Sequence, residues 1–273
     1  MVRGEGKQPK IAIIFRGKGN VKQYEKPAWH PDVDVYFQPN AWVDETTCIE
    51  WAEKTSKKFV KDEELDKFLL LCDNLEAQCS DSFKEAVHKM NGLVWYGLKN
   101  GTDLWQVVDA GVAQLLKNLI AIEHNEWLDK DENADLWFCH EKKFTASERR
   151  ILITHWAGKA WEKLTSPKYN SFMRNCWQKT GCLMTADGSD DKLIKPEGLL
   201  NYTVQPPSIL DPAPQLSVSN APQPIIEIEV DKIETSHLTI EDESEEWDER
   251  DSDEFDRDND SNVFDFIDKL LLG

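Results

Sequence analysis

Two aspartates in the sequence stand where an α/β fold positions metal ligands. Asp73 directly follows the apolar run "FLLLC" (68–72), and Asp109, separated from Asp73 by 35 residues, stands where a long helical pattern begins. The carboxyl ends of parallel strands meet at one edge of a sheet, so both carboxylates can face the same edge. Adjacent carboxylates repel unless a cation lies between them, and hard oxygen ligands suit Mg²⁺ or Mn²⁺, so the pattern predicts a divalent-metal site. The same spacing also fits a simple strand end at Asp73 and a helix cap at Asp109.

Apolar runs of strand length alternate with helical patterns through the first half of the chain. The patterns predict strands at 10–15, 33–38, 68–72 and 92–98, and helices at 44–64, 80–91 and 110–128. Asp44 and either Ser80 or Asp81 are the expected N-caps of the first two helices. The third and fourth strands are continuous apolar runs, as is typical of strands covered on both faces. The alternation of these elements predicts an α/β sheet with parallel strands and right-handed crossovers.

The negative charge of the chain is concentrated in its last quarter. From residue 201 onward there are 20 Asp and Glu against 4 Lys and Arg, whereas the first 200 residues carry 31 against 28. A proline-rich linker and the acidic run 241–260 have too little apolar surface to form a core. We therefore expect a helical, tryptophan-rich extension at 129–203 and a disordered acidic tail at 204–273. The closing run "VFDFIDKLLL" (263–272) fits either a short recognition helix or a disordered apolar end.

The composition argues against several classes of protein. The six cysteines have no CxxC pair or other metal-ligand spacing, and Cys139-His140 lacks partner ligands, so a zinc site is not expected. Because the N-terminus does not read as a signal peptide, we interpret these cysteines as reduced thiols inside a cell. No apolar run approaches the ~20 residues that span a bilayer, which predicts a soluble protein without a membrane partner.

Five segments of the chain occur in the same order as in a known family of enzymes. They are "IIFRGKG", "VDVYFQPNAW", "LLLCDNLEAQ", "GLVWYGLKNGTDLWQVVDAGVAQLLK" and "KTGCLMTADGSDDKLIKPEGL", within residues 9–203. In these segments the chain resembles the DDE superfamily endonuclease domain of pogo- and jerky-like transposases, to which a domain of centromere protein B is related. The resemblance implies a ribonuclease H-like fold and a DNA-binding protein of the nucleus. It also implies three acidic residues that hold two Mg²⁺ or Mn²⁺ ions for in-line attack on a DNA phosphodiester.

The resemblance assigns roles to particular residues of this chain. Asp73 corresponds to the second catalytic acid and Asp109 to the third, and both would bind metal. Asn74 matches the usual neighbour of the second acid. Gln106 matches a "QP-D" run of the family, in which Val107 replaces the usual proline.

The first catalytic acid of the family lies on an opening strand ahead of the "FRGKG" segment. In this chain Glu5 is the one acid ahead of that segment, and Asp32 and Asp34 follow it on a different strand. We therefore expect a ribonuclease H-like mixed sheet that lacks its first strand or strands, with a partial endonuclease domain at 9–128. Without its neighbour, strand 68–72 would keep an unpaired edge and an uncovered apolar face.

Two functions of different classes follow from these observations. The first is a transposase-derived, DDE-endonuclease-like protein that binds DNA weakly and is inactive, because the first metal ligand is absent. The ancestral activity would be Mg-dependent DNA cleavage and strand transfer. The second is a domesticated interaction scaffold whose acidic tail binds basic nuclear proteins such as histones. Active cleavage would require another acid, such as Glu5 or Asp34, to replace the missing ligand.

Overall fold

The computed structural model describes residues 1–97, 101–130, 132–138, 144–196, 198–199 and 201–204. Its strands are β1 (Ile11–Arg16), β2 (Val33–Gln38), β3 (Phe68–Cys72) and β4 (Gly92–Tyr96). Its α-helices are α1 (Glu25–Ala28), α2 (Glu45–Trp51), α3 (Lys57–Asp62), α4 (Glu76–Cys79), α5 (Asp81–His88), α6 (Thr102–Trp105), α7 (Ala113–Leu128), α8 (Asn133–Phe138), α9 (Ala146–Leu164) and α10 (Asn170–Lys179). Shorter turns are the π-helical η1 (Ala52–Ser56) and η2 (Val108–Val112) and the 3-10 helices η3 (Pro167–Tyr169) and η4 (Asp191–Leu193). The predicted strands and helices of the first half are therefore confirmed, and the tail at 205–273 lies outside the described residues.

The described strands form two separate parallel pairs. β1 pairs with β2 in register from Ile11↔Val33 to Arg16↔Gln38. β3 pairs with β4 in register from Phe68↔Gly92 to Cys72↔Tyr96. The predicted parallel pairing is confirmed, but among the described residues the pairs do not join into the single sheet that the sequence suggested. Instead, residues of β1 and β3 line a common cavity.

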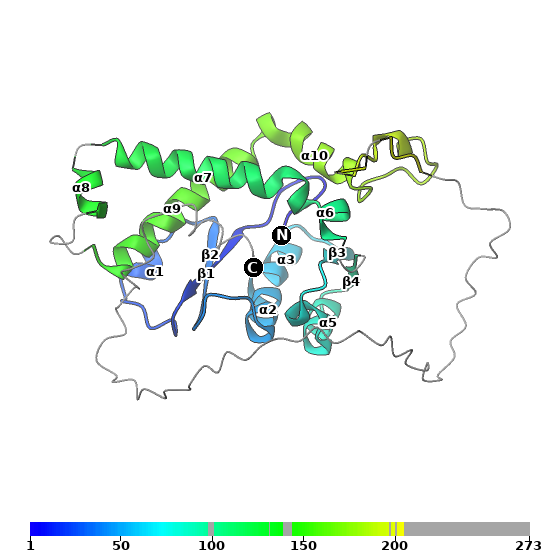
Figure 1. Cartoon of the computed structure of the whole chain (residues 1–273). Helices are drawn as coiled ribbons and strands as arrows, with labels where there is room; N and C mark the ends of the chain where they lie inside the picture. The colour runs from blue at the N-terminus through cyan, green and yellow to red at the C-terminus, as the bar shows by residue number, and fades with distance from the viewer. Residues whose placement is uncertain (98–100, 131, 139–143, 197, 200, 205–273) are drawn as a thin grey trace, which may run out of the picture. The chain divides into compact units, whose positions relative to one another are not determined.

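A first hydrophobic core joins β1 and β2 to the long helices. α7 and α9 pack against each other, and α9 also contacts both strands (Figure 1). Tryptophans of α7, α8 and α9 meet there edge to face, with ring centroids 5.3 Å apart for Trp137 and Trp156 and 5.7 Å apart for Trp127 and Trp156. The tryptophan-rich extension therefore shares its core with the strands, so it is part of the same folded unit.

A second core lies under one face of the β3–β4 pair. Leu70 and Cys72 of β3 pack there against residues of α2 and α5, among them Phe83 and Val87. The other face is open to solvent: Leu69 is 59% exposed, and Leu93 and Trp95 on β4 are 63% and 51% exposed. The prediction from the apolar runs, that these strands are covered on both faces, is therefore wrong, whereas the uncovered apolar face expected for strand 68–72 is found at Leu69. The apolar runs do form β3 and β4, but the described helices pack on one face of this pair only.

The predicted helix caps hold in the structure. The Oδ1 atom of Asp44 accepts a hydrogen bond from the backbone N–H of Thr47 at 2.8 Å, and Ser80 Oγ accepts one from Phe83 at 3.2 Å. The helix expected at 44–64 is interrupted by the π-helical turn η1. In that turn the Thr55 hydroxyl donates to Asp34 at 2.6 Å, which ties the helix to β2.

A buried ion pair fixes α1 to α9. The Glu25 side chain is fully buried, and Arg150 donates to it through Nε at 2.7 Å and through Nη2 at 3.0 Å. The Ser147 hydroxyl donates to the same carboxylate. Burial alone would raise the pKa of Glu25, but these hydrogen bonds and the charge of Arg150 lower the pKa below its usual value. The Glu25 carboxylate is therefore charged, and Arg150 is the cation that stabilises this buried charge.

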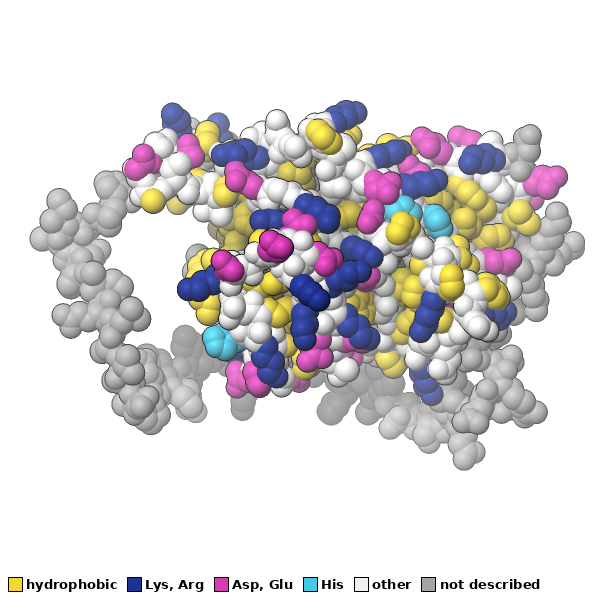
Figure 2. Space-filling model, turned by 180° about the vertical axis from the view of Figure 1, so that it is seen from behind, with side chains coloured by type: hydrophobic (Ala, Val, Ile, Leu, Met, Phe, Trp, Pro, Cys, Tyr) yellow, Lys and Arg dark blue, Asp and Glu magenta, His cyan; other side chains and the backbone are white. Residues whose placement is uncertain are grey.

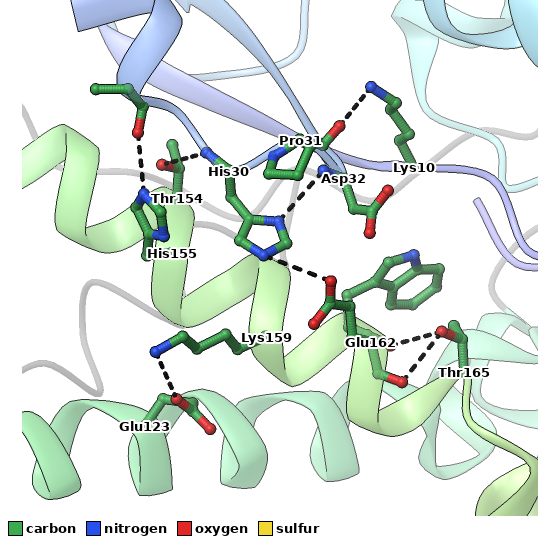
Figure 3. Close-up of polar contacts among 12 residues, drawn as sticks. Lys10, His30, Pro31, Asp32, Glu123, Thr154, His155, Lys159, Glu162 and Thr165 are labelled. Atoms are coloured by element: carbon green, nitrogen blue, oxygen red, sulfur yellow. Dashed lines mark hydrogen bonds and ion pairs between the residues drawn. The ribbon is translucent and has the colours of Figure 1, made fainter.

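A histidine anchors the start of β2 on α9, as Figure 3 shows. The backbone N–H of His30 donates to Thr154 Oγ1 at 3.2 Å, and Nδ1 of its ring accepts from the backbone N–H of Asp32, also at 3.2 Å. Nε2 of the ring lies 3.7 Å from a carboxylate oxygen of Glu162. The ring packs directly on the α9 backbone at Gly158, where a Cβ atom would lie 2.1 Å from Nδ1.

Replacing Arg150 by alanine is expected to destabilise the protein by about 3 kcal/mol, because it leaves the Glu25 carboxylate buried without its partner. The free energy of unfolding from urea denaturation measures the effect. The matched control is Arg174→Ala, since Arg174 donates to Glu5 at 2.6 Å in a pair whose side chains are 54% and 62% exposed. Such exposed pairs contribute between about 0 and 1 kcal/mol. Equal losses for the two variants would contradict the role given to the buried pair.

Replacing Gly158 by alanine is expected to lower the free energy of unfolding, although alanine favours helices by about 1 kcal/mol over glycine. The new methyl group overlaps the His30 ring, and overpacking of this kind costs about 1 to 3 kcal/mol. The control is Lys159→Ala at the next position of α9, where the side chain is about half exposed. A Gly158→Ala protein as stable as, or more stable than, the unsubstituted protein would show that the ring can move aside.

Candidate functional site

A cavity of about 600 Å³ brings the two predicted metal ligands to one surface. Its lining comes from β1, β3, the α2–α3 helix and the turn before α7, and it includes both Asp73 and Asp109. The basic side chains of Arg3 and Lys67 and the amide of Gln106 line the same cavity. The volume lies in the range that is usual for ligand sites. Because Lys67 precedes β3 and Asp73 follows it, the cavity extends along the length of this strand.

Asp73 is held at the carboxyl end of β3 by local hydrogen bonds. Its Oδ1 atom accepts from the backbone N–H of Leu75 at 3.2 Å, which forms a turn between β3 and α4. Its neighbour Asn74 donates from Nδ2 to the carbonyl of Gly97 at 3.0 Å. Since Gly97 follows β4, Asn74 joins the ends of the two strands and steadies the segment that carries Asp73.

Asp109 lies in the π-helical turn η2, ahead of α7. The N-cap of α7 is Val112, which makes no side-chain cap hydrogen bond, so Asp109 is not a cap of this helix. Gly111, inside η2, has φ of 127°, a conformation that L side chains rarely adopt, so the backbone bends between Asp109 and α7. The alternative reading of Asp109 as a helix cap is therefore wrong. The exposed Asp109 carboxylate belongs to the cavity wall instead.

The backbone at Val107 has a conformation that a proline could also adopt. Val107 has φ of −57°, which is within the range that a proline ring imposes. Its side chain is buried in the first core. A valine at this position is therefore compatible with the backbone conformation that a proline would set.

The thiols next to the site are held in the neutral form. Burial, and after it the charge of Asp73, raises the pKa of Cys72 to about 12, and burial with the nearby Asp44 raises the pKa of Cys48 to about 11. A neutral buried thiol is a poor nucleophile and a poor metal ligand. The cysteines that the structure describes are free thiols, as predicted. Cys139 and His140 lie outside the described residues.

Neither proposed substitute for the first acid reaches the cavity. Glu5 pairs with Arg174, and Asp34 accepts the Thr55 hydroxyl in the contact between β2 and η1. Among the described residues that line the cavity, Asp73 and Asp109 are the ones with a carboxylate. The sequence analysis did not single out Arg3 or Lys67. A lysine often flanks an apolar strand, so the position of Lys67 in the sequence does not by itself predict a binding site.

A second set of possible ligands, His30, Asp32 and Glu162, lies on the side of α9 that Figure 3 shows. Their ligand atoms are within 4.8 Å of one another. Because Nδ1 of His30 accepts the N–H of Asp32, the ring proton resides on Nε2 and points toward Glu162. A metal on Nε2 would require this proton to move to Nδ1, where it would face another N–H. The hydrogen bonds therefore favour a structural anchor over a metal site.

The described surface carries mixed charge. Figure 2 shows Lys and Arg side chains interspersed with Asp and Glu over the face that it presents. This distribution agrees with the near balance of charges counted in the first 200 residues. None of the described helices is both long and apolar enough to cross a membrane.

Comparison with known families gives one match that covers most of the described chain. The family described as DDE superfamily endonuclease matches residues 2–177, which include both cores and the cavity with Asp73 and Asp109. Searches of curated proteins and of solved structures give no significant match. Since the family match spans well over half of the sequence, the chain belongs to the DDE superfamily endonuclease family.

Proposed function

We propose that this chain is a transposase-derived, nuclease-like protein that binds DNA weakly and does not cleave it. The observation that carries the proposal is the cavity wall. Asp73 and Asp109 both belong to it, and among the described lining residues no third carboxylate joins them. DDE endonucleases usually use divalent metal ions, so the number of acidic ligands decides what the site can do.

We infer that the oxygen donors of the cavity would suit one hard cation. The carboxylates of Asp73 and Asp109 would hold Mg²⁺ or Mn²⁺, and the amide oxygen of Gln106 is a further hard donor in the same wall. In two-metal nucleases the ions activate the attacking oxygen and stabilise the leaving one. They must be held about 4 Å apart by shared ligands. Two carboxylates satisfy this requirement poorly, which supports binding of an ion without cleavage.

The remaining charges support weak binding of DNA. Lys67 in the cavity wall can neutralise a phosphate, whereas the Arg3 guanidinium is already paired with the Glu63 carboxylate at 3.7 Å. The near-neutral body and the acidic tail oppose this attraction, because affinity for DNA depends on neutralising phosphates with Lys and Arg. DNA as the partner, and the nucleus as the compartment, are part of the proposal.

The proposal includes a ribonuclease H-like architecture of the pogo and jerky type. Two features support it: the strand pairs are parallel, and residues of both β1 and β3 line one cavity. A strand placed between these two edges would connect the pairs into one sheet. Fold alone does not establish activity, so the proposal rests on the ligands.

In a protein whose Asp and Glu residues at 241–260 are replaced by Asn and Gln, so that the acidic run does not itself bind Mn²⁺, titration with Mn²⁺ followed by electron paramagnetic resonance is expected to show one weak site with a dissociation constant on the order of 10⁻³ M. The Asp73→Asn, Asp109→Asn double variant should lose it, because the amides keep the shape of the carboxylates without their charge. The control is Asp81→Asn on α5, an exposed carboxylate that pairs with Lys84 away from the cavity. Equal Mn²⁺ binding by the double variant would exclude the assigned ligands.

In the same preparations, supercoiled plasmid with Mg²⁺ or Mn²⁺ is expected to remain uncut. Nicking by the unsubstituted protein that disappears in the double variant would refute the inactive site. Separate Glu5→Gln and Asp34→Asn variants would then show whether one of these acids supplies the missing ligand.

A second candidate function rests on the charge of the tail. Residues from 201 onward carry 20 acidic against 4 basic side chains, so the tail can attract basic proteins such as histones. Replacement of the Asp and Glu residues at 241–260 by Asn and Gln is expected to abolish salt-sensitive binding of core histones in fluorescence anisotropy. The Asp73→Asn, Asp109→Asn variant should bind as the unsubstituted protein does. Binding that survives neutralisation of the tail would argue against this scaffold role.

A further inference from the structure

The open face of the β3–β4 pair is a continuous apolar surface. The in-register pairs Leu69↔Leu93 and Leu71↔Trp95 place these four side chains on the same side of the two strands. The alternate residues of β3 point into the second core under α2 and α5. Parallel strands are normally buried on both faces, and an exposed apolar patch of this kind marks an interaction site.

This surface continues beyond the strands at both sides. At one side Trp105 meets Trp95 edge to face, with ring centroids 6.1 Å apart. At the other side Leu69 and Leu71 also line the cavity that contains Asp73. The apolar surface is therefore broader than the two strands, and helices are the elements that normally cover parallel strands.

The chain itself contains a segment with matching chemistry, outside the described residues. In "VFDFIDKLLL" (263–272) the apolar residues Val263, Phe266, Ile267, Leu270 and Leu271 recur at the spacing of one helix face. The charged residues Asp265, Asp268 and Lys269 fall on the opposite side. Asn262 before the segment suits an N-cap, and Gly273 after it suits a helix end.

We propose that residues 263–272 form a helix that packs on the open face of β3–β4, over Leu69, Leu71, Leu93 and Trp95. A helix of ten residues is marginal in water by itself, so it would form on contact with this face. Because Leu69 and Leu71 also line the cavity that contains Asp73, the docked segment would lie next to that cavity, but the contact itself requires no metal ion. The proposal concerns residues 263–272 and not the acidic run 241–260.

The length of chain that connects the two parts permits this contact. Residues 205–262 provide a connection of 58 residues, whose root-mean-square span is about 40 Å for a flexible chain. Such a tether gives an effective concentration of about 1 mM, so that even a docking dissociation constant of about 0.1 mM keeps the segment bound about ten times as often as free. Even weak packing of residues 263–272 on the open face would therefore keep the segment bound most of the time.

Hydrogen–deuterium exchange of the full chain, read by mass spectrometry, tests the proposal. We expect the amides of 265–272 to exchange about tenfold more slowly than a random coil. In a Leu93→Asp variant they should exchange at the random-coil rate, because a charge then lies in the contact. The matched control is Ile122→Asp on α7, another exposed apolar side chain, which should leave the protection unchanged.

A second pair of variants guards against a folding defect in the body. Ile267→Asp should release the segment while β3 and β4 keep their own protection, and Asn259→Asp adds the same charge in the acidic run without effect. Random-coil exchange of 265–272 in the unsubstituted protein would overturn the proposal. So would protection that Leu93→Asp leaves intact, or protection that rises with protein concentration, which would mean that the segment binds a second copy.

Discussion

The packing of α9 on the β1–β2 pair is the interaction on which the rest of the described structure depends. Its inner face carries Trp156, Ala157, Ala160, Trp161 and Leu164, all buried in the first core. Further contacts fix the position of the helix. Arg150 forms an ion pair with the buried Glu25, and the His30 ring packs on the backbone at Gly158. The indole N–H of Trp161 also donates to the carbonyl of Pro9, just before β1, at 2.9 Å. The second half of the chain therefore holds the first pair of strands in place.

The local features of the fold were predictable because the residues that cause them are neighbours in the sequence. Asp44 and Ser80 cap their helices through the N–H groups three residues later, and runs such as "FLLLC" form strands. The resemblance led us to expect an uncovered apolar face on strand 68–72, but the exposure of Leu93 and Trp95 on β4 could not be predicted from neighbouring residues, because it depends on which distant elements cover the strand. For the same reason the sequence could not show the pair of His30 with Glu162, which belong to different parts of the chain.

The candidate site was predictable from two sources of different strength. From spacing alone, Asp109 could have been a helix cap. The resemblance of the surrounding segments to the endonuclease family favoured the interpretation of Asp109 as a catalytic acid. The structure contradicts the interpretation of Asp109 as a cap, because the backbone bends at Gly111, between Asp109 and α7. Both carboxylates line one cavity. That they share a metal ion remains a prediction. The basic side chains of the same wall, Arg3 and Lys67, became visible only when the fold brought them together.

The position of β3 has a consequence for the behaviour of the protein at high concentration. Among the described residues β3 pairs with β4 alone, so its other edge can pair with a strand of another molecule and begin aggregation. The strand itself is five apolar residues, but Asp66 and Lys67 precede it and Asp73 follows it. Charged residues that flank an apolar strand act as gatekeepers against such association. Asp73 would then protect solubility in addition to its proposed role as a metal ligand, and a neutral substitution there would favour self-association even in the absence of a metal ion.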